Sequence, residues 1–255
     1  MNPGTVVVYC LIAIAAAPLA HAAGSLPDKL RIEYRVTTGG ARVGTNIRTL
    51  ERQADGTYTH GLRTRPEGMA RMFTRVEWVE EGKLRVRDGR VEPLFYTKYR
   101  VGSKNPRRKS VTFDRDNGKL VFSDGRSDPL PAGVMDEASV AYAFMLQPPA
   151  KAVTGHLLLT NGKRTVPYDY RMLRDESLAT VVGELETRVV EWHTNDGDNE
   201  ERFTAWLAPA RGWLPVKVVA VDGNYTATMT LSLLETTGPA SASAPVAPLR
   251  DRPTE

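Results

Sequence analysis

The sequence predicts a mainly β domain in which a single long, curved antiparallel sheet, a half-open barrel, wraps around one short helix. Many segments alternate apolar and polar residues and are separated by glycine-containing turn sequences, as in antiparallel sheets. Only residues 135–149 have clear helical spacing, and no repeat of fixed length indicates a propeller or solenoid. Since flat sheets of many strands are rare, we expect this sheet to curl, with the helix covering its concave face.

Both ends of the 255-residue chain are expected to lie outside this domain. An apolar run over residues 6–19 is followed by Ala20-His21-Ala22, a small-x-small cleavage pattern, so residues 1–22 are predicted to be a signal peptide and the protein periplasmic. The run is short for a membrane span. Residues 236–255, which include the Ala-, Ser- and Pro-rich stretch 238–248, are expected to be a disordered tail, and this leaves residues 23–235 as a single β-rich domain.

Composition excludes several chemistries. Cys10 is the only cysteine and lies within the predicted signal peptide, so the mature chain would have no disulfide, no cysteine nucleophile and no thiolate metal ligand. The formal charge of +4 favours anionic envelope surfaces as neighbours.

The segments before the helix are predicted to be hairpin-joined strands. Residues 29–37 alternate most clearly, with Leu30, Ile32 and Tyr34 on one face and charged residues on the other. Gly39-Gly40, Asp55-Gly56, Glu81-Gly82 and Asp116-Asn117-Gly118 are predicted turns. The strands expected between them are residues 29–37, 43–52, 57–65, 72–80, 83–88, 93–101, 111–114 and 120–123.

The predicted helix covers residues 136–147. Asp136 is a suitable N-cap and Pro148-Pro149 a suitable end. Val140, Phe144 and Met145 share one face, and the wide apolar arc predicts a buried helix. After it, strands are expected over residues 157–160, 164–173, 179–182, 186–194, 201–208, 214–221 and 225–234.

A set of short motifs occurs in a recognisable order: Tyr34-Arg-Val, Gly40, Val43-Gly44, Tyr58, Val91-Glu-Pro93, Phe113-Asp114, Asn117-Gly118, Asp136-Glu-Ala-Ser139, Trp206-Leu-Ala, Leu214-Pro-Val216 and Leu231. Over most of residues 29–235 the chain thereby resembles a family of exported Gram-negative bacterial proteins, domain of unknown function 3108. The resemblance implies no reaction and no catalytic residues. In architecture it is similar to the half-open barrels of periplasmic lipoprotein carriers, an analogy of shape that does not define function.

The sequence does not predict catalytic residues. Asp136 and Ser139 lie one turn apart, but no Gly-x-Ser-x-Gly elbow occurs, and helix capping explains both residues. The alternative is a hydrolase whose site is assembled from strand residues. His60, His156 and His193 show no metal-ligand spacing, and residues 195–201 lack the pattern of a calcium loop, so no metal and no cofactor is predicted.

Two groups of residues are candidates for binding. Met69, Met72 and Phe73 follow a Pro-Glu-Gly loop and could line an adaptable hydrophobic mouth above Phe144, or else begin the core of the next strand. The segment 98–109 has no acidic residue and could contact anionic lipid headgroups, the alternative being a solvated loop that protects a strand edge; its basic residues are Lys98, Arg100, Lys104, Arg107, Arg108 and Lys109. Nucleic acid is not an expected partner.

The sequence thus predicts a non-enzymatic periplasmic protein, peripheral to the membrane at most. Its curved sheet would bind a hydrophobic or anionic envelope ligand, a lipid or a lipoprotein-like molecule, on its concave face. The alternative is a structural or assembly factor with a solid core that acts through contacts with an envelope protein partner.

Overall fold

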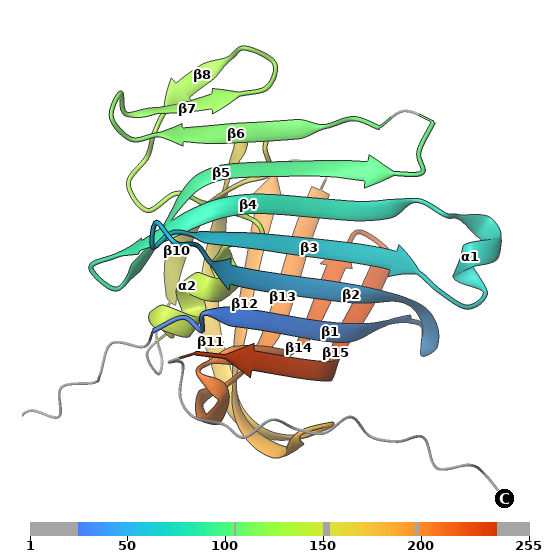
Figure 1. The fold of residues 1–255 in the computed structure, drawn as a ribbon. Coiled ribbons are helices and arrows are strands. Elements are labelled where there is room, and N and C mark those ends of the chain that lie inside the picture. Colours follow the sequence, from blue (N-terminus) through green and yellow to red (C-terminus); the bar gives the residue numbers. More distant parts are fainter. Residues whose placement is uncertain (1–24, 105, 150–153, 197–198, 239–255) are drawn as a thin grey trace, which may run out of the picture.

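A computed structural model of the chain describes residues 25–104, 106–149, 154–196 and 199–238. In these residues fifteen strands form one sheet, in the order β8-β7-β6-β5-β4-β3-β2-β1-β15-β14-β13-β12-β11-β10-β9 (Figure 1). This confirms the predicted mainly β fold and its single long sheet. The predicted signal peptide and nearly all of the predicted tail lie outside the described residues.

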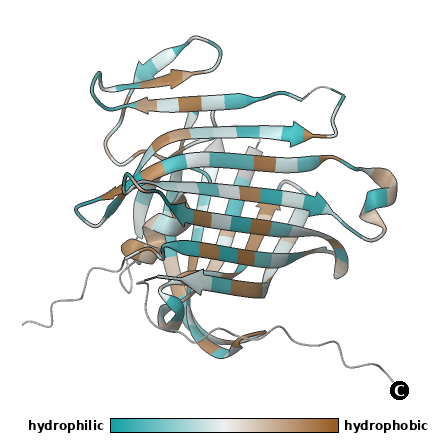
Figure 2. Cartoon of the chain, in the orientation of Figure 1, coloured by the Kyte–Doolittle hydropathy of each residue, from teal (hydrophilic) through white to brown (hydrophobic). Residues whose placement is uncertain are grey.

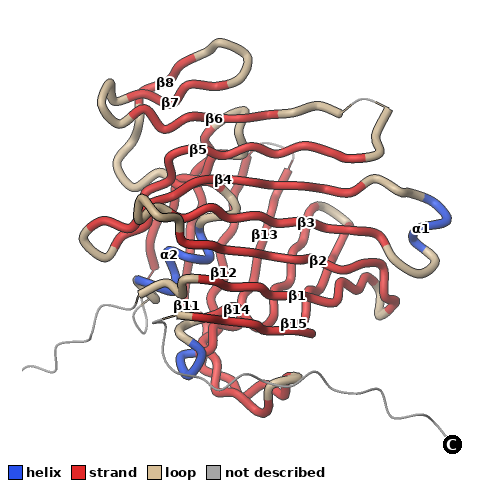
Figure 3. The backbone as a smooth tube through the Cα atoms, in the orientation of Figure 1, coloured by secondary structure: helices blue, strands red, loops and turns tan. Residues whose placement is uncertain are grey.

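The strands before the main helix are β1 (Lys29–Thr38), β2 (Ala41–Arg52), β3 (Tyr58–Pro66), β4 (Glu77–Arg87), β5 (Arg90–Val101), β6 (Lys109–Asp114), β7 (Lys119–Phe122), β8 (Ser127–Pro129) and β9 (Met135–Asp136). Those after it are β10 (Thr154–Thr160), β11 (Thr165–Thr180), β12 (Gly183–Asp196), β13 (Asn199–Ala208), β14 (Leu214–Asp222) and β15 (Tyr225–Thr237). The helical segments are α1 (Ala70–Phe73), α2 (Val140–Leu146) and the 3₁₀ turn η1 (Pro209–Arg211). Strand dominates the backbone, as Figure 3 shows.

All pairings in the described sheet are antiparallel except that of β9 with β10, and strands that follow one another in the chain are neighbours except β8 and β9. At the centre, β1 pairs with β2 on one side and with β15 on the other, so the first and last strands lie side by side. At one edge, β9 pairs in parallel with β10. The strand order ends at β8 and β9, so the described sheet is open, in agreement with a half-open barrel.

The sheet bends so that its two halves face each other. In Figure 1, β1 to β8 run across the front with β15 beside β1, and β10 to β14 pass behind them at a steep angle. α2 contacts β5 from one half and β14 from the other, whereas α1 extends beyond the opposite end of the sheet. Apolar and polar positions alternate along the strands in Figure 2, so each strand directs one row of side chains into the concave interior.

Helix α2 is shorter than the predicted helix over residues 136–147, and the predicted N-cap is wrong. Asp136 belongs to β9. Its Oδ1 accepts hydrogen bonds from the backbone N–H groups of Ala138 (3.0 Å) and Ser139 (2.8 Å), which turn the chain before the helix starts. The Ser139 hydroxyl donates to the backbone oxygen of Asp136 (3.3 Å) and makes no capping bond.

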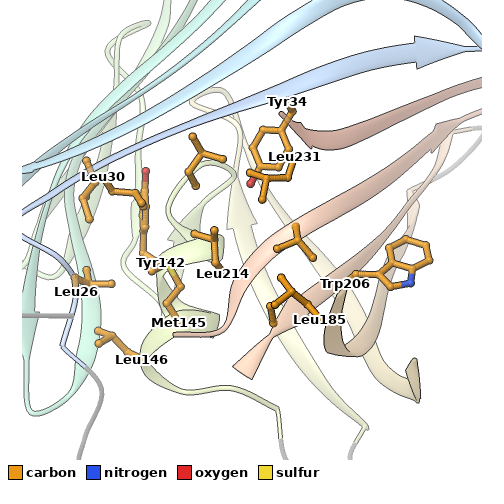
Figure 4. Packing of buried hydrophobic residues seen from close by; sticks show 14 of the residues in the cluster. Leu26, Leu30, Tyr34, Tyr142, Met145, Leu146, Leu185, Trp206, Leu214 and Leu231 are labelled. Atoms are coloured by element: carbon orange, nitrogen blue, oxygen red, sulfur yellow. The ribbon is translucent and has the colours of Figure 1, made fainter. Parts of the chain in front are cut away.

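The buried residues of α2 hold two parts of the core together. Tyr142, Met145 and Leu146 pack in a cluster that draws residues from both halves of the sheet (Figure 4). Val140 and Phe144 pack in a second cluster with strands of the C-terminal half. This confirms the prediction of a buried helix enclosed by the sheet.

The predicted turn at Glu81-Gly82 is wrong, because β4 passes through it without interruption and turns at Asp88-Gly89 instead. Gly82 lies opposite His60 in β3, and a Cβ atom on Gly82 would be 2.3 Å from His60 Nε2. The glycine is therefore required for the close approach of the imidazole ring and does not mark a turn.

Several strand boundaries also differ from prediction, and β8 and β9 were not predicted. β11 is one long strand that joins the predicted strands 164–173 and 179–182, because β12 pairs with it from Asp169 to Thr180 and so spans the gap between them. The predicted strand 72–80 begins only at Glu77, and residues 70–73 form α1 instead.

Candidate functional site

A cavity of about 300 Å³ lies between the two halves of the sheet, and α2 forms part of its wall. Its apolar lining is Leu62, Val140, Ala141, Phe144, Leu159, Trp192, Phe203, Ala205, Leu207, Pro215, Val218 and Met229. Its polar lining is Tyr34, Asn46, Arg48, Thr64, Glu80, Lys98, Glu137, Tyr168 and Glu201. The strands before α2 supply most of the polar residues and the strands after it most of the apolar ones, so the cavity is amphipathic.

Aromatic rings form the apolar wall. Phe144 packs edge-on against Trp192, with ring centroids 5.8 Å apart, and Trp192 stacks on Phe203 at 5.4 Å. Trp192 and Phe203 are direct cross-strand partners in β12 and β13, so the sheet itself fixes the stack. Phe144, predicted from its helical position to contact ligand, is thus placed in the cavity wall.

A buried ionic cluster forms the opposite wall. The Lys98 ammonium lies 2.7 Å from a Glu137 carboxylate oxygen and 3.5 Å from Glu80. The Tyr96 hydroxyl donates to the other Glu80 oxygen at 2.8 Å. Lys98 and Glu80 are partners across β4 and β5, while Glu137 comes from the turn that leads into α2. We call Glu80, Tyr96, Lys98 and Glu137 the Lys98 cluster.

Burial and pairing set the ionisation of the Lys98 cluster. Desolvation acts to lower the pKa of Lys98, but attraction to Glu80 and Glu137 outweighs it, so the pKa is raised and the ammonium stays charged. Desolvation raises the pKa of Glu137, and the nearby Lys98 only partly offsets this. A charged side chain held in place within a largely apolar cavity is suited to binding a polar group of a ligand.

Two further polar groups extend this wall. The Arg48 guanidinium donates to the backbone oxygen of Ala138 (2.7 Å) and lies 5.8 Å from the centre of the Tyr142 ring, while its Nε atom has no partner among the described residues. The Tyr168 hydroxyl donates to Glu201 at 2.7 Å. The cavity therefore has three carboxylates, of Glu80, Glu137 and Glu201, against two cationic groups.

The three residues predicted to line a hydrophobic mouth do not border the cavity. Met69, Met72 and Phe73 lie at α1 and are strongly exposed, and none belongs to the cavity lining. The structure therefore does not bring them together with Phe144.

The basic side chains of the segment 98–109 lie in different environments. Lys98 faces the cavity, whereas Arg100 stacks on Trp78 (4.1 Å) and Arg108 on Tyr99 (4.2 Å). Lys104 and Arg107 are exposed; Lys109 is half-buried, and its backbone oxygen accepts a hydrogen bond from the Thr97 hydroxyl.

The histidines do not converge. His60 is buried against the Tyr142 ring, His156 pairs with Asp169 on the surface, and His193 lies on β12. The described residues contain no group of three or more His, Cys, Asp or Glu side chains that could hold a metal ion. Asp136 and Ser139, which were predicted to cap the helix, form the local turn described above.

Fold and site define a class of protein: an open β half-barrel with a small amphipathic cavity beneath a short helix. Residues 33–232 match the family described as "Protein of unknown function (DUF3108)", and the chain belongs to this family, which confirms the resemblance in the sequence. No curated protein matches it. No helix in the described part of the chain is long and apolar enough to cross a membrane.

One solved structure shows the same fold. It is the "Beta-barrel-like Protein of Domain of Unknown Function DUF1849 from Brucella abortus", with a TM-score of 0.56. The match covers 84% of this chain and 99% of that protein, at 13% sequence identity. At this identity the likeness concerns the fold alone.

Proposed function

We propose that the protein is a non-enzymatic periplasmic binding protein that holds an apolar or amphipathic envelope molecule, a lipid or lipoprotein-like ligand, in the cavity beneath α2. The single observation that supports this most strongly is the amphipathic lining. One wall consists of Phe144, Trp192 and Phe203, and the other presents the Lys98 cluster. Export rests on the apolar residues 6–19 and the cleavage pattern after them.

The size of the cavity limits the ligand. At about 300 Å³ it is at the lower end of the usual range for ligand pockets, roughly 300–1,000 Å³. It can therefore enclose one acyl chain segment or a small amphipath, and a larger lipid would leave much of its surface outside. In the proposed complex the apolar part lies on Trp192 and the polar group meets Lys98.

Filling the cavity provides the test. Ala141 lies on α2 in the cavity wall, and Ala141→Phe adds a ring to that space, whereas Ala132→Phe changes an exposed turn and serves as the control. The uncharged fluorophore N-phenylnaphthylamine should bind the wild type and Ala132→Phe with enhanced emission. Ala141→Phe should weaken binding at least about tenfold while its thermal unfolding remains cooperative, because the ring displaces the ligand.

Native mass spectrometry addresses the natural ligand. Protein extracted from membranes should carry a mass that is absent from Ala141→Phe. If neither the fluorophore nor an extracted molecule binds the wild type, the binding proposal fails. The alternative, an envelope assembly factor that works through protein contacts, would then be favoured.

A further inference from the structure

The segment around α1 is the most exposed apolar surface in the described part of the chain. Met69, Met72 and Phe73 expose 74, 80 and 84% of their surface, more than any other large hydrophobic residue described. All three lie within five consecutive positions on the connection between β3 and β4, which extends beyond the end of the sheet (Figure 1). Exposed apolar groups that gather in this way indicate an interaction site.

The connection is held in this position by ordered contacts. The Glu67 backbone N–H donates to the Val43 oxygen (2.9 Å), and the Glu67 carboxylate pairs with Arg42 at 2.7 Å. On the other side Gly102 approaches so closely that a Cβ atom there would lie 3.0 Å from the Arg75 backbone oxygen. The β1–β2 hairpin and the β5–β6 connection therefore support α1 from both flanks.

Basic side chains are exposed on the α1 segment and on the β5–β6 connection that approaches it at Gly102. Arg71 and Arg75 are exposed on the α1 segment, and Lys104 and Arg107 are exposed on the neighbouring β5–β6 connection. Among the described residues none of these four forms an ion pair, since the nearby carboxylates of Glu67 and Glu77 are paired with Arg42, Arg63 and Arg65. We call Arg71, Arg75, Lys104 and Arg107 the basic rim.

We propose that α1 and the basic rim form a docking surface for an anionic lipid bilayer, with Met69, Met72 and Phe73 entering the boundary between headgroups and acyl chains. Apolar side chains flanked by cations are the pattern of peripheral membrane contacts. The five-residue segment 69–73 with its three large apolar side chains is small beside the roughly 800 Å² that each partner buries in a stable protein interface. A fluid bilayer, unlike a protein partner, needs no complementary surface to take up a few apolar side chains.

A reporter on the tip provides the test. Met72→Cys in a Cys10→Ser background carries an environment-sensitive nitrobenzoxadiazole label, and a label at Val121→Cys, an exposed apolar position on β7, is the control. With vesicles of phosphatidylcholine and phosphatidylglycerol, the label at position 72 should brighten and shift to the blue, and added salt should reverse the change. The label at position 121 should not respond, and neither should position 72 with vesicles of phosphatidylcholine alone.

Two variants test the parts of the surface. With the reporter retained at position 72, Phe73→Ser should lower vesicle partitioning about tenfold, because the partition free energy of one inserted ring is lost. Arg71→Glu with Arg75→Glu should abolish binding to anionic vesicles. Both changes are at exposed positions outside the cavity lining, so fluorophore binding in the cavity should not change.

Several outcomes would overturn the proposal. A label at position 72 that does not respond to anionic vesicles shows that the tip does not enter the bilayer. An equal response with phosphatidylcholine alone, or unchanged binding after charge reversal, removes the anionic-lipid part. Since these readouts are independent of cavity binding, failure here and failure of the ligand proposal can be told apart.

Discussion

His60 links the stability of this fold to pH. Its imidazole is buried on β3 beside Gly82 and the Tyr142 ring, and neither ring nitrogen has a hydrogen-bond partner among the described residues. Desolvation, assisted by repulsion from Arg48, lowers the pKa of His60 from 6.5 to about 4. Replacing it with leucine, which has a similar volume, removes the titrating group and preserves most of the packing.

The sign and size of the effect follow from this shift. Well above pH 6.5 the imidazole is neutral in both the folded and the unfolded chain, so it contributes no pH dependence there. As the pH falls from 6.5 to about 4, the unfolded chain binds a proton that the folded protein does not bind, and stability is lost. The pKa of His60 is 6.5 in the unfolded chain and about 4 in the folded protein. This difference lowers the free energy of unfolding by about 3 kcal/mol once the imidazole is protonated in both states.

Urea unfolding, followed by tryptophan fluorescence between neutral and acidic pH, measures this loss. The wild type should lose about 2–3 kcal/mol more than His60→Leu on acidification to about pH 4.5, because other groups titrate equally in both proteins and cancel in the difference. His193→Gln, which removes an imidazole from another strand, is the control. If the wild-type and His60→Leu profiles remain parallel, His60 binds its proton in the folded state and the desolvation argument is refuted.

Three other changes test the packing around the cavity by urea unfolding. Phe144→Ala should lower the free energy of unfolding by about 3–5 kcal/mol, since it removes a buried ring from the second core cluster; a loss below about 1 kcal/mol would contradict its packing role. Lys98→Met should cost roughly 3–5 kcal/mol near neutral pH and less at acidic pH, because Glu80 and Glu137 lose their cation; equal loss at both pH values would contradict this. Gly82→Ala should cost about 2 kcal/mol or more, because its methyl group meets the imidazole and a backbone oxygen, and a neutral result would show that this contact relaxes freely.

Alternation along the chain predicted most strands because one face of the sheet is buried. Residues 29–37 and 225–234 were both predicted, and they form β1 and β15 with small extensions. The errors occurred where a residue has a tertiary role that differs from its usual local one. Gly82 is a typical turn residue, but here it makes room for a ring from the neighbouring strand, which no local pattern can show.

The site was only partly predictable for the same reason. Phe144 followed from helical spacing, because its burial depends on one element. Lys98 fell within the predicted strand 93–101 but was grouped with the basic segment 98–109 as a contact for anionic headgroups. It shares its strand face with the buried Tyr96, two residues earlier, and that parity was the available signal for a buried position. Its partners Glu80 and Glu137 come from a different strand and from the turn before α2, so only the folded register brings the three together.

The cavity itself follows from a mismatch in length between the helix and the strands. With seven residues α2 is about 10 Å long, whereas a twelve-residue strand such as β2 spans about 40 Å. The helix therefore fills only part of the space between the two halves of the sheet. Met135 and Asp136 pair with β10, and the Glu137 backbone N–H donates to the Thr160 oxygen (3.3 Å), so this backbone belongs to the sheet and not to the helix. Glu137 then lies against Lys98 in the space that remains. Because Asp136 is part of β9, α2 is shorter than the sequence predicts, and the cavity occupies the space that a longer helix would fill.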